Sequence, residues 1–383
     1  MGYLHYEIEF EQRAKNKRGI CGDVFYWERT PKETIMLLSD GLGHGIKANI
    51  AANLCVSRLK ELLHNGFSVR NAFATVAKTM DEAVAKELPY AVFTVVRILP
   101  DGMTTVLSFE MPSPILVSKK ISTILNQRMI KIGNNNIGEA TCVLSPNDAI
   151  MIMSDGITQA GLGRGLKLGW ESTGVNKFIN DYVWQKKNIF ELPRYLSLEA
   201  YRLCENNEDD DSTVAIAVCR PGGTVNIFTG PPANKMMDTK IVRRFMSQDG
   251  VKIVCGATTA KIVAAALGKQ LEIDSIKLHG DFTPPASAIE GIDLVTEGAL
   301  TLNQLYNVLD EDRDDLVEFN PVTEIYDYVM DADRVVFYVG RAVNPASYDI
   351  SFKQMGLLSR TKIVPMLADK LRRKGKLVLM EFI

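Results

Sequence analysis

The sequence lacks several features that would place it in common functional classes. It has no apolar run near the roughly 20 residues that a membrane helix needs, and its first residues lack the basic-then-apolar pattern of a secretory signal. The 44 lysines and arginines nearly balance the 46 aspartates and glutamates, which leaves a net charge of −2. We therefore expect a cytoplasmic protein that binds neither nucleic acid nor a membrane surface.

Cysteine and histidine are also scarce. The six cysteines are scattered and form no C-x-x-C pair, so we expect reduced and mostly buried thiols. The four histidines show no zinc-ligand spacing, so any metal would be held mainly by carboxylates, which favours a hard cation. The chain lacks the C-x5-R phosphatase loop, the G-x-S-x-G elbow and the G-x-x-x-x-G-K-[ST] phosphate loop. Hydrolysis through a cysteine or serine nucleophile of those kinds is thereby excluded.

What is present indicates two domains. The chain has 383 residues, of which 46% are hydrophobic and 23% charged, as in folded globular proteins. In the first half, strand patterns alternate with two long helical patterns, which we expect over residues 44–64 and 68–88. After Pro221-Gly222-Gly223, short apolar strands alternate with helices, which is typical of an α/β domain with a mainly parallel sheet. We expect domains over residues 1–220 and 221–383.

Aspartates stand at the ends of several expected strands in the first half. They occur in the segments CGD (21–23), SDG (39–41), SDG (154–156) and DDDST (209–213). Any one of these segments alone is typical of a turn. Brought together, the carboxylates would repel by about 4 kcal/mol per pair at 4 Å, for an effective dielectric constant near 20. Because divalent cations would offset this repulsion, the pattern favours a metal site.

In their order and spacing, the four segments resemble the PPM-type metal-dependent protein serine/threonine phosphatases, in particular their SpoIIE-like bacterial branch. The matching segments read ICGDVF, LLSDGLGHG, MIMSDGIT and DDDSTVAIAV, and the resemblance spans approximately residues 1–220. It implies an α+β fold, in which an αββα sandwich is followed here by the smaller α/β domain. It also implies that water activated by two Mn²⁺ or Mg²⁺ ions hydrolyses phosphoserine or phosphothreonine on a protein partner.

The resemblance also implies roles for individual residues. Asp23 would bridge the two metal ions. Asp40 and the backbone carbonyl of Gly41 would bind the first ion, and Asp155 and Asp210 would bind the second. These residues would act in catalysis through the water that the two ions activate.

Two of the assignments leave alternatives open. The family pattern selects Asp210 over Asp209 as the ligand, with Asp211 beside it, and a shift by one position stays open. His44, in the turn after Asp40, is a candidate acid for the leaving oxygen. A role at the start of the helix or at the surface is the alternative for this histidine.

Regulation would enter through the two long helices and the second domain. In the SpoIIE-like branch, such helices resemble a switch that transmits contacts from a partner or a dimer to the metal site. Ordinary core packing is the alternative that accounts for the apolar positions of the first helix, which are Ile46, Ile50, Leu54, Leu59 and Leu62. The second domain resembles no family, and we expect a regulatory or sensor module. Its strand-glycine-helix segment 251–266 would suit an anion or a nucleotide, but any α/β unit turns a corner in this way.

Two other functions compete with the phosphatase. The chain could be a catalytically weak adaptor or signalling module whose second domain binds a small ligand. Alternatively, the second domain could carry its own small-molecule chemistry. The sequence leaves open the phosphoprotein substrate, the physiological metal, a small-molecule or protein regulator at the second domain, and a homodimer.

Overall fold

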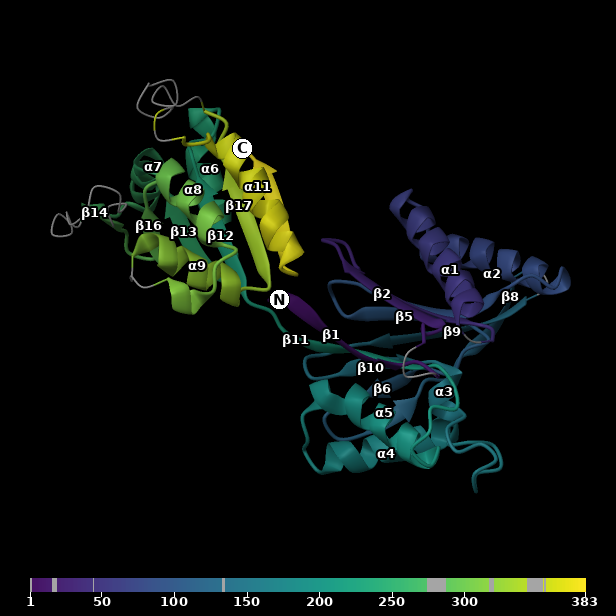
Figure 1. Cartoon of the computed structure of the whole chain (residues 1–383). Coiled ribbons are helices and arrows are strands. Elements are labelled where there is room, and N and C mark those ends of the chain that lie inside the picture. The colour runs from purple at the N-terminus through teal and green to yellow at the C-terminus, as the bar shows by residue number, and fades with distance from the viewer. Residues whose placement is uncertain are drawn as a thin grey trace. The chain divides into compact units, whose positions relative to one another are not determined.

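The computed structural model divides the chain into two compact units (Figure 1). The N-terminal unit comprises residues 4–221, and the C-terminal unit comprises residues 222–383 together with the first residues up to Tyr3. Each unit has hydrophobic cores of its own. The structure describes residues 2–15, 19–43, 45–132, 135–273, 287–316, 320–342, 354 and 356–383.

The N-terminal unit contains a six-stranded antiparallel sheet. Its strands follow the order β2 (Asp23–Arg29), β3 (Thr34–Gly41), β4 (Ala91–Ile98), β5 (Met103–Phe109), β9 (Asn135–Val143) and β8 (Arg128–Ile132). In the register of the sheet, Asp23 pairs with Asp40, and Asp40 pairs with Val92. Two of the predicted metal ligands are therefore direct neighbours across two strands.

A second antiparallel sheet in the same unit has five strands. They follow the order β1 (Leu4–Arg13), β11 (Ser212–Pro221), β10 (Ala149–Met153), β6 (Ile115–Val117) and β7 (Ser122–Ile124). The neighbours β10 and β11 pair Met153 with Val214. Asp155 follows β10 and Asp210 precedes β11, so the register brings the other two predicted ligands to one end of this sheet.

Helices cover the outer face of each sheet, so that the unit has four layers (Figure 1). The helices α1 (Ile46–His64) and α2 (Val69–Ala85) bury one core against the six-stranded sheet. The helices α4 (Glu171–Trp184) and α5 (Leu192–Leu203) bury another against the five-stranded sheet, and a third core fills the space between the sheets. This arrangement confirms the predicted αββα sandwich. The short helices of this unit are α3 (Asp155–Thr158) and η1 (Ile189–Glu191).

Three details refine the local predictions. Asp155 opens the short helix α3, so the simple turn, which was the alternative for a lone segment, does not apply there. Asp23 is the first residue of β2 and therefore stands at a strand end, as expected. Core packing does not account for all of α1, because three of its apolar residues point outward: Ile46 is 63% exposed, Ile50 52% and Leu54 62%. These three residues are four positions apart and share one face of α1, whereas Leu59 and Leu62 lie on the buried face.

The C-terminal unit contains one sheet, whose central strands are parallel as predicted. The order is β14 (Glu272–Ile273), β15 (Ser287–Ala288), β16 (Leu294–Thr296), β13 (Val251–Cys255), β12 (Thr224–Thr229), β17 (Arg334–Val339) and β18 (Leu377–Phe382). All pairs from β16 to β18 are parallel.

Helices pack on both faces of this sheet. On one face lie α6 (Asp238–Met246) and α7 (Ala257–Leu267). On the other lie α8 (Ala299–Val308), α9 (Pro321–Asp331) and α11 (Arg360–Arg373). The short helices are η2 (Lys235–Met237) and η3 (Arg313–Asp315). This topology is the α/β domain that the sequence predicts.

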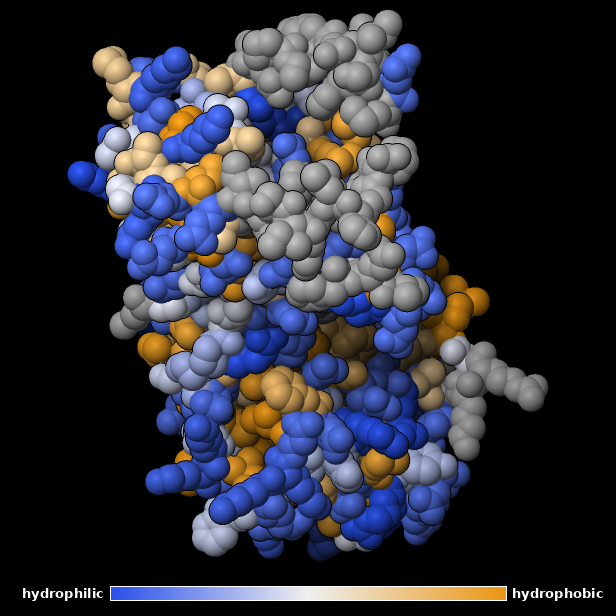
Figure 2. All heavy atoms as spheres, turned by 90° about the vertical axis from the view of Figure 1, so that its left-hand side faces the viewer, coloured by the Kyte–Doolittle hydropathy of each residue, from blue (hydrophilic) through white to orange (hydrophobic). Residues whose placement is uncertain are grey.

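The surface and the cysteines are unremarkable for a folded protein. Hydrophobic residues are interspersed with hydrophilic ones on the face that Figure 2 shows. Among the described residues, no helix has both the length and the apolar character needed to cross a bilayer. All six cysteines are free, and four of them are buried.

Candidate metal centre

Asp23 is the most tightly held of the predicted ligands. It is only 2% exposed, and its Oδ2 accepts hydrogen bonds from Ser154 Oγ and Thr213 Oγ1, both at 2.7 Å. Burial raises the pKa of Asp23 to about 6, while the two hydroxyl donors act in the opposite direction. Its other oxygen, Oδ1, is buried and has no hydrogen-bond partner within the described residues. A buried acceptor left in this way costs about 1–3 kcal/mol, unless something else occupies it.

Asp40 is the second-last residue of strand β3 and pairs with Asp23 in β2. Burial raises the pKa of Asp40 to about 10, and the charges of Asp23 and Asp155 add to this, followed by the charge of Asp210. Each of the other three predicted ligands therefore stands close enough to disfavour a charge on Asp40. The direction of this shift agrees with the predicted grouping of the four carboxylates, which stays a prediction.

Gly41 connects Asp40 to the helix that follows. A Cβ at Gly41 would come within 1.9 Å of the carbonyl oxygen of Ala48 in α1, so only glycine fits this approach. The Gly41 N–H donates to the Gly22 carbonyl at 3.4 Å, and the Gly41 carbonyl oxygen faces Gly22. The predicted backbone ligand thus lies beside the loop that carries Asp23.

Asp155 and Asp210 approach from the five-stranded sheet. Asp155 Oδ2 accepts a hydrogen bond from Gln159 Nε2 at 2.6 Å, one turn further along the chain. Asp210 Oδ1 accepts from the N–H of Asp211 at 3.0 Å. Burial raises the pKa of Asp210, and the charge of Asp155 contributes in the same direction. Asp155 and Asp210 are therefore close to one another.

The structure distinguishes among the three consecutive aspartates at 209–211. Asp209 forms an ion pair with Arg164. Arg164 Nε lies 2.8 Å from Asp209 Oδ2, and Arg164 Nη2 donates to Asp209 Oδ1 at 2.9 Å. This bidentate contact occupies both carboxylate oxygens of Asp209. Within the part of the chain that the structure describes, no side chain donates a hydrogen bond to Asp210, which accepts only from the backbone N–H of Asp211. The geometry favours Asp210 over Asp209 as the metal ligand.

Asp211 holds the loop before Asp23 in place by hydrogen bonds. It is 5% exposed, and its two oxygens accept from the backbone N–H groups of Lys15 and Gly22 at 2.8 and 2.9 Å. A Cβ at Gly22 would lie 2.8 Å from Asp211 Oδ2, so glycine is needed for this contact. The sequence predicts only that Asp211 lies beside the ligands. The run of three aspartates predicts a ligand in this segment, but the sequence does not determine which of the three carboxylates faces the site.

Ser154 and Thr213 are site residues that the sequence interpretation missed. Their hydroxyls fix Asp23, and the Thr213 N–H donates in turn to Ser154 Oγ at 2.9 Å. Both residues lie within the matching segments: Ser154 directly precedes Asp155, and Thr213 follows Asp210 by three positions. This proximity to predicted ligands could have identified them from the sequence. His44, the candidate acid, lies outside the described residues.

The donor set fits a hard divalent cation. It consists of carboxylate oxygens and one backbone carbonyl, the ligands that Mg²⁺ and Mn²⁺ prefer. The unpartnered Oδ1 of Asp23 and the mutual repulsion felt by Asp40 are the features that a bound cation would relieve. Metal binding by these residues stays a prediction.

Comparison with known proteins bears on this unit. Residues 30–220 match the family model of stage II sporulation protein E (SpoIIE). Residues 30–220 therefore form a SpoIIE-type domain. Asp23 lies just before the matched residues, so its assignment rests on the motif and on the geometry given above. No curated protein sequence matches the chain.

Several solved structures resemble the chain at low identity. The PP2C phosphatase domain of SpoIIE from Bacillus subtilis, with a fragment of its regulatory domain, is 18% identical with a TM-score of 0.49. That match covers 57% of this chain and 64% of the other. The RsbU and RsbW domains of a Mycobacterium tuberculosis protein are 16% identical, with a TM-score of 0.49 and coverage of 64% and 67%. RsbX in complex with magnesium is 17% identical, with a TM-score of 0.42 and coverage of 57% and 96%.

In the C-terminal unit, which resembles no family, the strand-glycine-helix segment is tied to its neighbours. The Gly256 N–H donates to the Thr296 carbonyl at 2.7 Å, and Thr259 Oγ1 accepts from the Gly230 N–H at 2.9 Å. These bonds join three loops at the same end of the parallel sheet. They use groups that an anion would otherwise bind, and a ligand for this unit stays a prediction.

Proposed function

We propose that the N-terminal unit hydrolyses phosphoserine or phosphothreonine on a protein partner, using two Mg²⁺ or Mn²⁺ ions. One observation supports the proposal: burial raises the pKa of Asp40, and the charges of Asp23, Asp155 and Asp210, which come from two different sheets, act in the same direction. A fold gains nothing from such repulsion unless a cation offsets it. The SpoIIE-type phosphatase domain supports the same reaction class.

The residues would divide the work as follows. Asp23 would bridge the ions, Asp40 and the Gly41 carbonyl would hold the first, and Asp155 and Asp210 would hold the second. When bound, the ions supply a water of lowered pKa and offset charge on the phosphoryl oxygens.

The chain's own residues fix the ligands in place. Ser154 and Thr213 restrict Asp23 to one orientation, because both of their hydroxyls donate to the same oxygen. Gln159 orients Asp155 by a hydrogen bond to Oδ2. Partners of this kind usually matter for metal affinity nearly as much as the ligands themselves.

Hydrolysis of p-nitrophenyl phosphate by the full chain tests this proposal. We expect turnover that requires Mn²⁺ or Mg²⁺ and falls at least a hundredfold in Asp23→Asn and Asp155→Asn. Asp181→Asn, an equal change of charge at an exposed position of α4, should leave the rate unchanged. Absence of turnover with either metal, together with unaltered Mn²⁺ binding in the two ligand variants, would favour the catalytically weak adaptor.

We also infer that the exposed face of α1 binds a second copy of the chain. Leu42 is 56% exposed and precedes the three outward residues Ile46, Ile50 and Leu54. Exposed apolar stripes of this kind mark interaction surfaces, and an uncharged stripe can pack against itself across a two-fold axis. Because α1 follows Gly41 closely, a contact on this helix would act near Asp40.

For the C-terminal unit we propose a regulatory role. Its continuity with the phosphatase domain through β11 and β12 supports this, since only Gly222 and Gly223 separate the two strands. Melting of the full chain with nucleotides and with common metabolites tests the proposal, because a ligand raises the melting temperature of the unit that binds it.

A further inference from the structure

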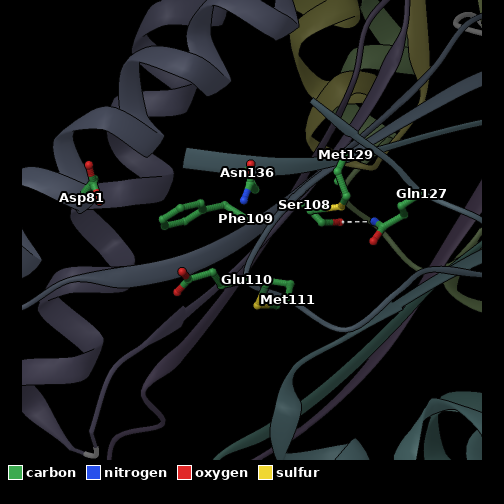
Figure 3. Close-up of a pocket in the computed structure, with 9 residues that line it drawn as sticks. Asp81, Ser108, Phe109, Glu110, Met111, Gln127, Met129 and Asn136 are labelled. Carbon is green, nitrogen blue, oxygen red and sulfur yellow. Dashed lines mark hydrogen bonds between the residues drawn. The ribbon is translucent and has the colours of Figure 1, made fainter. Parts of the chain in front are cut away.

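The N-terminal unit has a pocket of about 490 Å³ where α2, the end of β5 and the pair β8–β9 meet (Figure 3). Its volume falls within the range of sites that hold small ligands or side chains. Asp81 comes from α2, Ser108 from β5, and Glu110 from the residue after β5 ends. Met129 comes from β8. Three separate parts of the fold therefore form the walls.

Negative charge in the pocket is not neutralised. Asp81 and Glu110 line it, and the lining includes no lysine, arginine or histidine. Within the described residues, neither acid has an ion-pair partner, whereas the neighbouring Arg70 and Arg128 both pair with Glu139. A cation entering the pocket would thus find two free carboxylates.

The remaining walls suit a long side chain with a charged end. Gln127 Nε2 donates to Ser108 Oγ at 3.0 Å, the contact drawn in Figure 3, and Ser113 Oγ donates to Gln127 Oε1 at 3.4 Å. Gln127 also packs over Gly138, where a Cβ would lie 2.7 Å from its Oε1. The amide is therefore held in place. The exposed Met129 offers apolar surface to the methylene stem of lysine or arginine.

The pocket lies at the same end of the six-stranded sheet as Asp40, where β3 and β5 both end. Asp40 pairs with Val92 in β4, and the next residue, Phe93, pairs with Phe109 in β5. Phe93 also pairs with Ser39 in β3, so Ser39 and Phe109 lie two strands apart in the same register, and Asp40 and Glu110 are the residues that directly follow them. At about 4.8 Å per strand, the Cα atoms of Ser39 and Phe109 are roughly 10 Å apart. An extended peptide rises about 3.3 Å per residue, so this distance corresponds to three residues.

Glu110 is set apart from β5 by its backbone. Its φ is 54°, in the left-handed region that non-glycine residues adopt rarely. The chain therefore turns out of the sheet at the residue that carries the carboxylate. Such conformations persist where the surrounding structure enforces them, often at binding sites.

We propose that this pocket binds a basic side chain of the phosphoprotein substrate, three residues from the phosphorylated residue, with Glu110 and Asp81 as its partners. The inference rests on the proposed phosphatase function and specifies its substrate. A phosphorylated residue at the aspartate cluster and a lysine or arginine in the pocket would together set the direction and register of the peptide along the sheet edge.

Phosphoserine peptides provide the test. Each peptide carries one arginine at two to five positions on either side of the phosphoserine, with alanine elsewhere, and is compared with the all-alanine peptide. For the unaltered chain with Mn²⁺ we expect kcat/KM to rise about tenfold for arginine three positions away. In Glu110→Gln with Asp81→Asn, that ratio should fall below twofold, and Glu110→Arg should reverse it in favour of a glutamate peptide.

A matched control and a separate readout keep the two proposals distinguishable. Glu61→Gln removes the same charge at an exposed position of α1, about 22 Å along the helix from its start, and should keep the tenfold ratio. Turnover of p-nitrophenyl phosphate by the unaltered chain reports on the phosphatase function alone. If that turnover is present but all peptides have equal kcat/KM, or the ratio survives in the double variant, the pocket proposal is wrong.

Discussion

Replacing Asp40 by asparagine should stabilise the protein in the absence of metal. An aspartate in the unfolded chain has a pKa near 3.8 and is charged at neutral pH, whereas burial and the charges of Asp23 and Asp155 raise the pKa of folded Asp40 to about 10. The raised pKa costs no stability below pH 3.8. Above it, the folded state must keep a proton that the unfolded state has lost, so stability falls as the pH rises.

The size of this effect follows from the same shift. The cost grows by about 1.4 kcal/mol for each pH unit, which gives about 4 kcal/mol at pH 7 and about 2 kcal/mol at pH 5. Because Asp40 is partly accessible to water, solvent relaxation reduces these figures, and we expect a gain of about 2–4 kcal/mol for Asp40→Asn at pH 7. In a unit of this size that corresponds to roughly 5–10 °C in melting temperature.

Differential scanning calorimetry of the full chain in EDTA, from pH 5 to pH 8, measures the gain. The transition that Mn²⁺ raises in the unaltered chain identifies the N-terminal unit, and Asp181→Asn serves as the control of equal charge change. The advantage of Asp40→Asn should grow with pH and should disappear when Mn²⁺ is added, since the variant has lost a ligand. The electrostatic account of the site would be refuted if Asp40→Asn melted below the unaltered chain at pH 7. It would also be refuted if the difference in melting temperature between the two did not change with pH.

Three further predictions concern the support of the site and the α1 surface. Thr213→Val removes one of the two hydroxyl donors to Asp23 and should weaken Mn²⁺ binding by about 10- to 100-fold in titration calorimetry, with the far-ultraviolet dichroism unchanged. Unchanged affinity would mean that Asp23 needs no such orientation. Gly22→Ala places a Cβ 2.8 Å from Asp211 Oδ2 and should lower the free energy of unfolding in urea by about 1–3 kcal/mol. Equal stability would show that Asp211 moves freely. Leu54→Glu puts a charge into the exposed stripe of α1 and should convert dimers to monomers in light scattering; a monomeric unaltered chain at high concentration would contradict the dimer.

The sequence predicted the parts of the site that depend on local pattern. The aspartates stand beside strand ends, and the strong apolar runs of β3, β10 and β11 marked those ends. The pairing of Asp23 with Asp40 could not be predicted, because the register between two strands depends on packing along their whole length. The short strands β6 and β7, of three residues each, carry too few residues to show a period.

Helix α1 shows where periodicity is ambiguous. Its apolar residues recur at three- and four-residue steps all around, so the sequence identified the helix but left open whether its apolar positions pack in the core or transmit contacts from a partner. In the structure, Leu59 and Leu62 face the sheet, whereas Ile46, Ile50 and Leu54 do not. A helix that is apolar on two faces either lies between two layers or meets a partner. Hydropathy alone does not separate these cases, because it does not say which neighbours the fold supplies.

The candidate metal centre joins the two sheets, and this ties its geometry to their packing. Asp23 and Asp40 come from the six-stranded sheet, whereas Ser154 and Thr213, which hold Asp23, lie at the ends of strands in the other. The apolar core between the sheets therefore opposes the repulsion of the carboxylates in the absence of metal. A small displacement of one sheet against the other would separate Asp40 from Asp155 and Asp210. Helix α1 packs against β3, and we propose that a partner bound to its exposed face would cause that displacement.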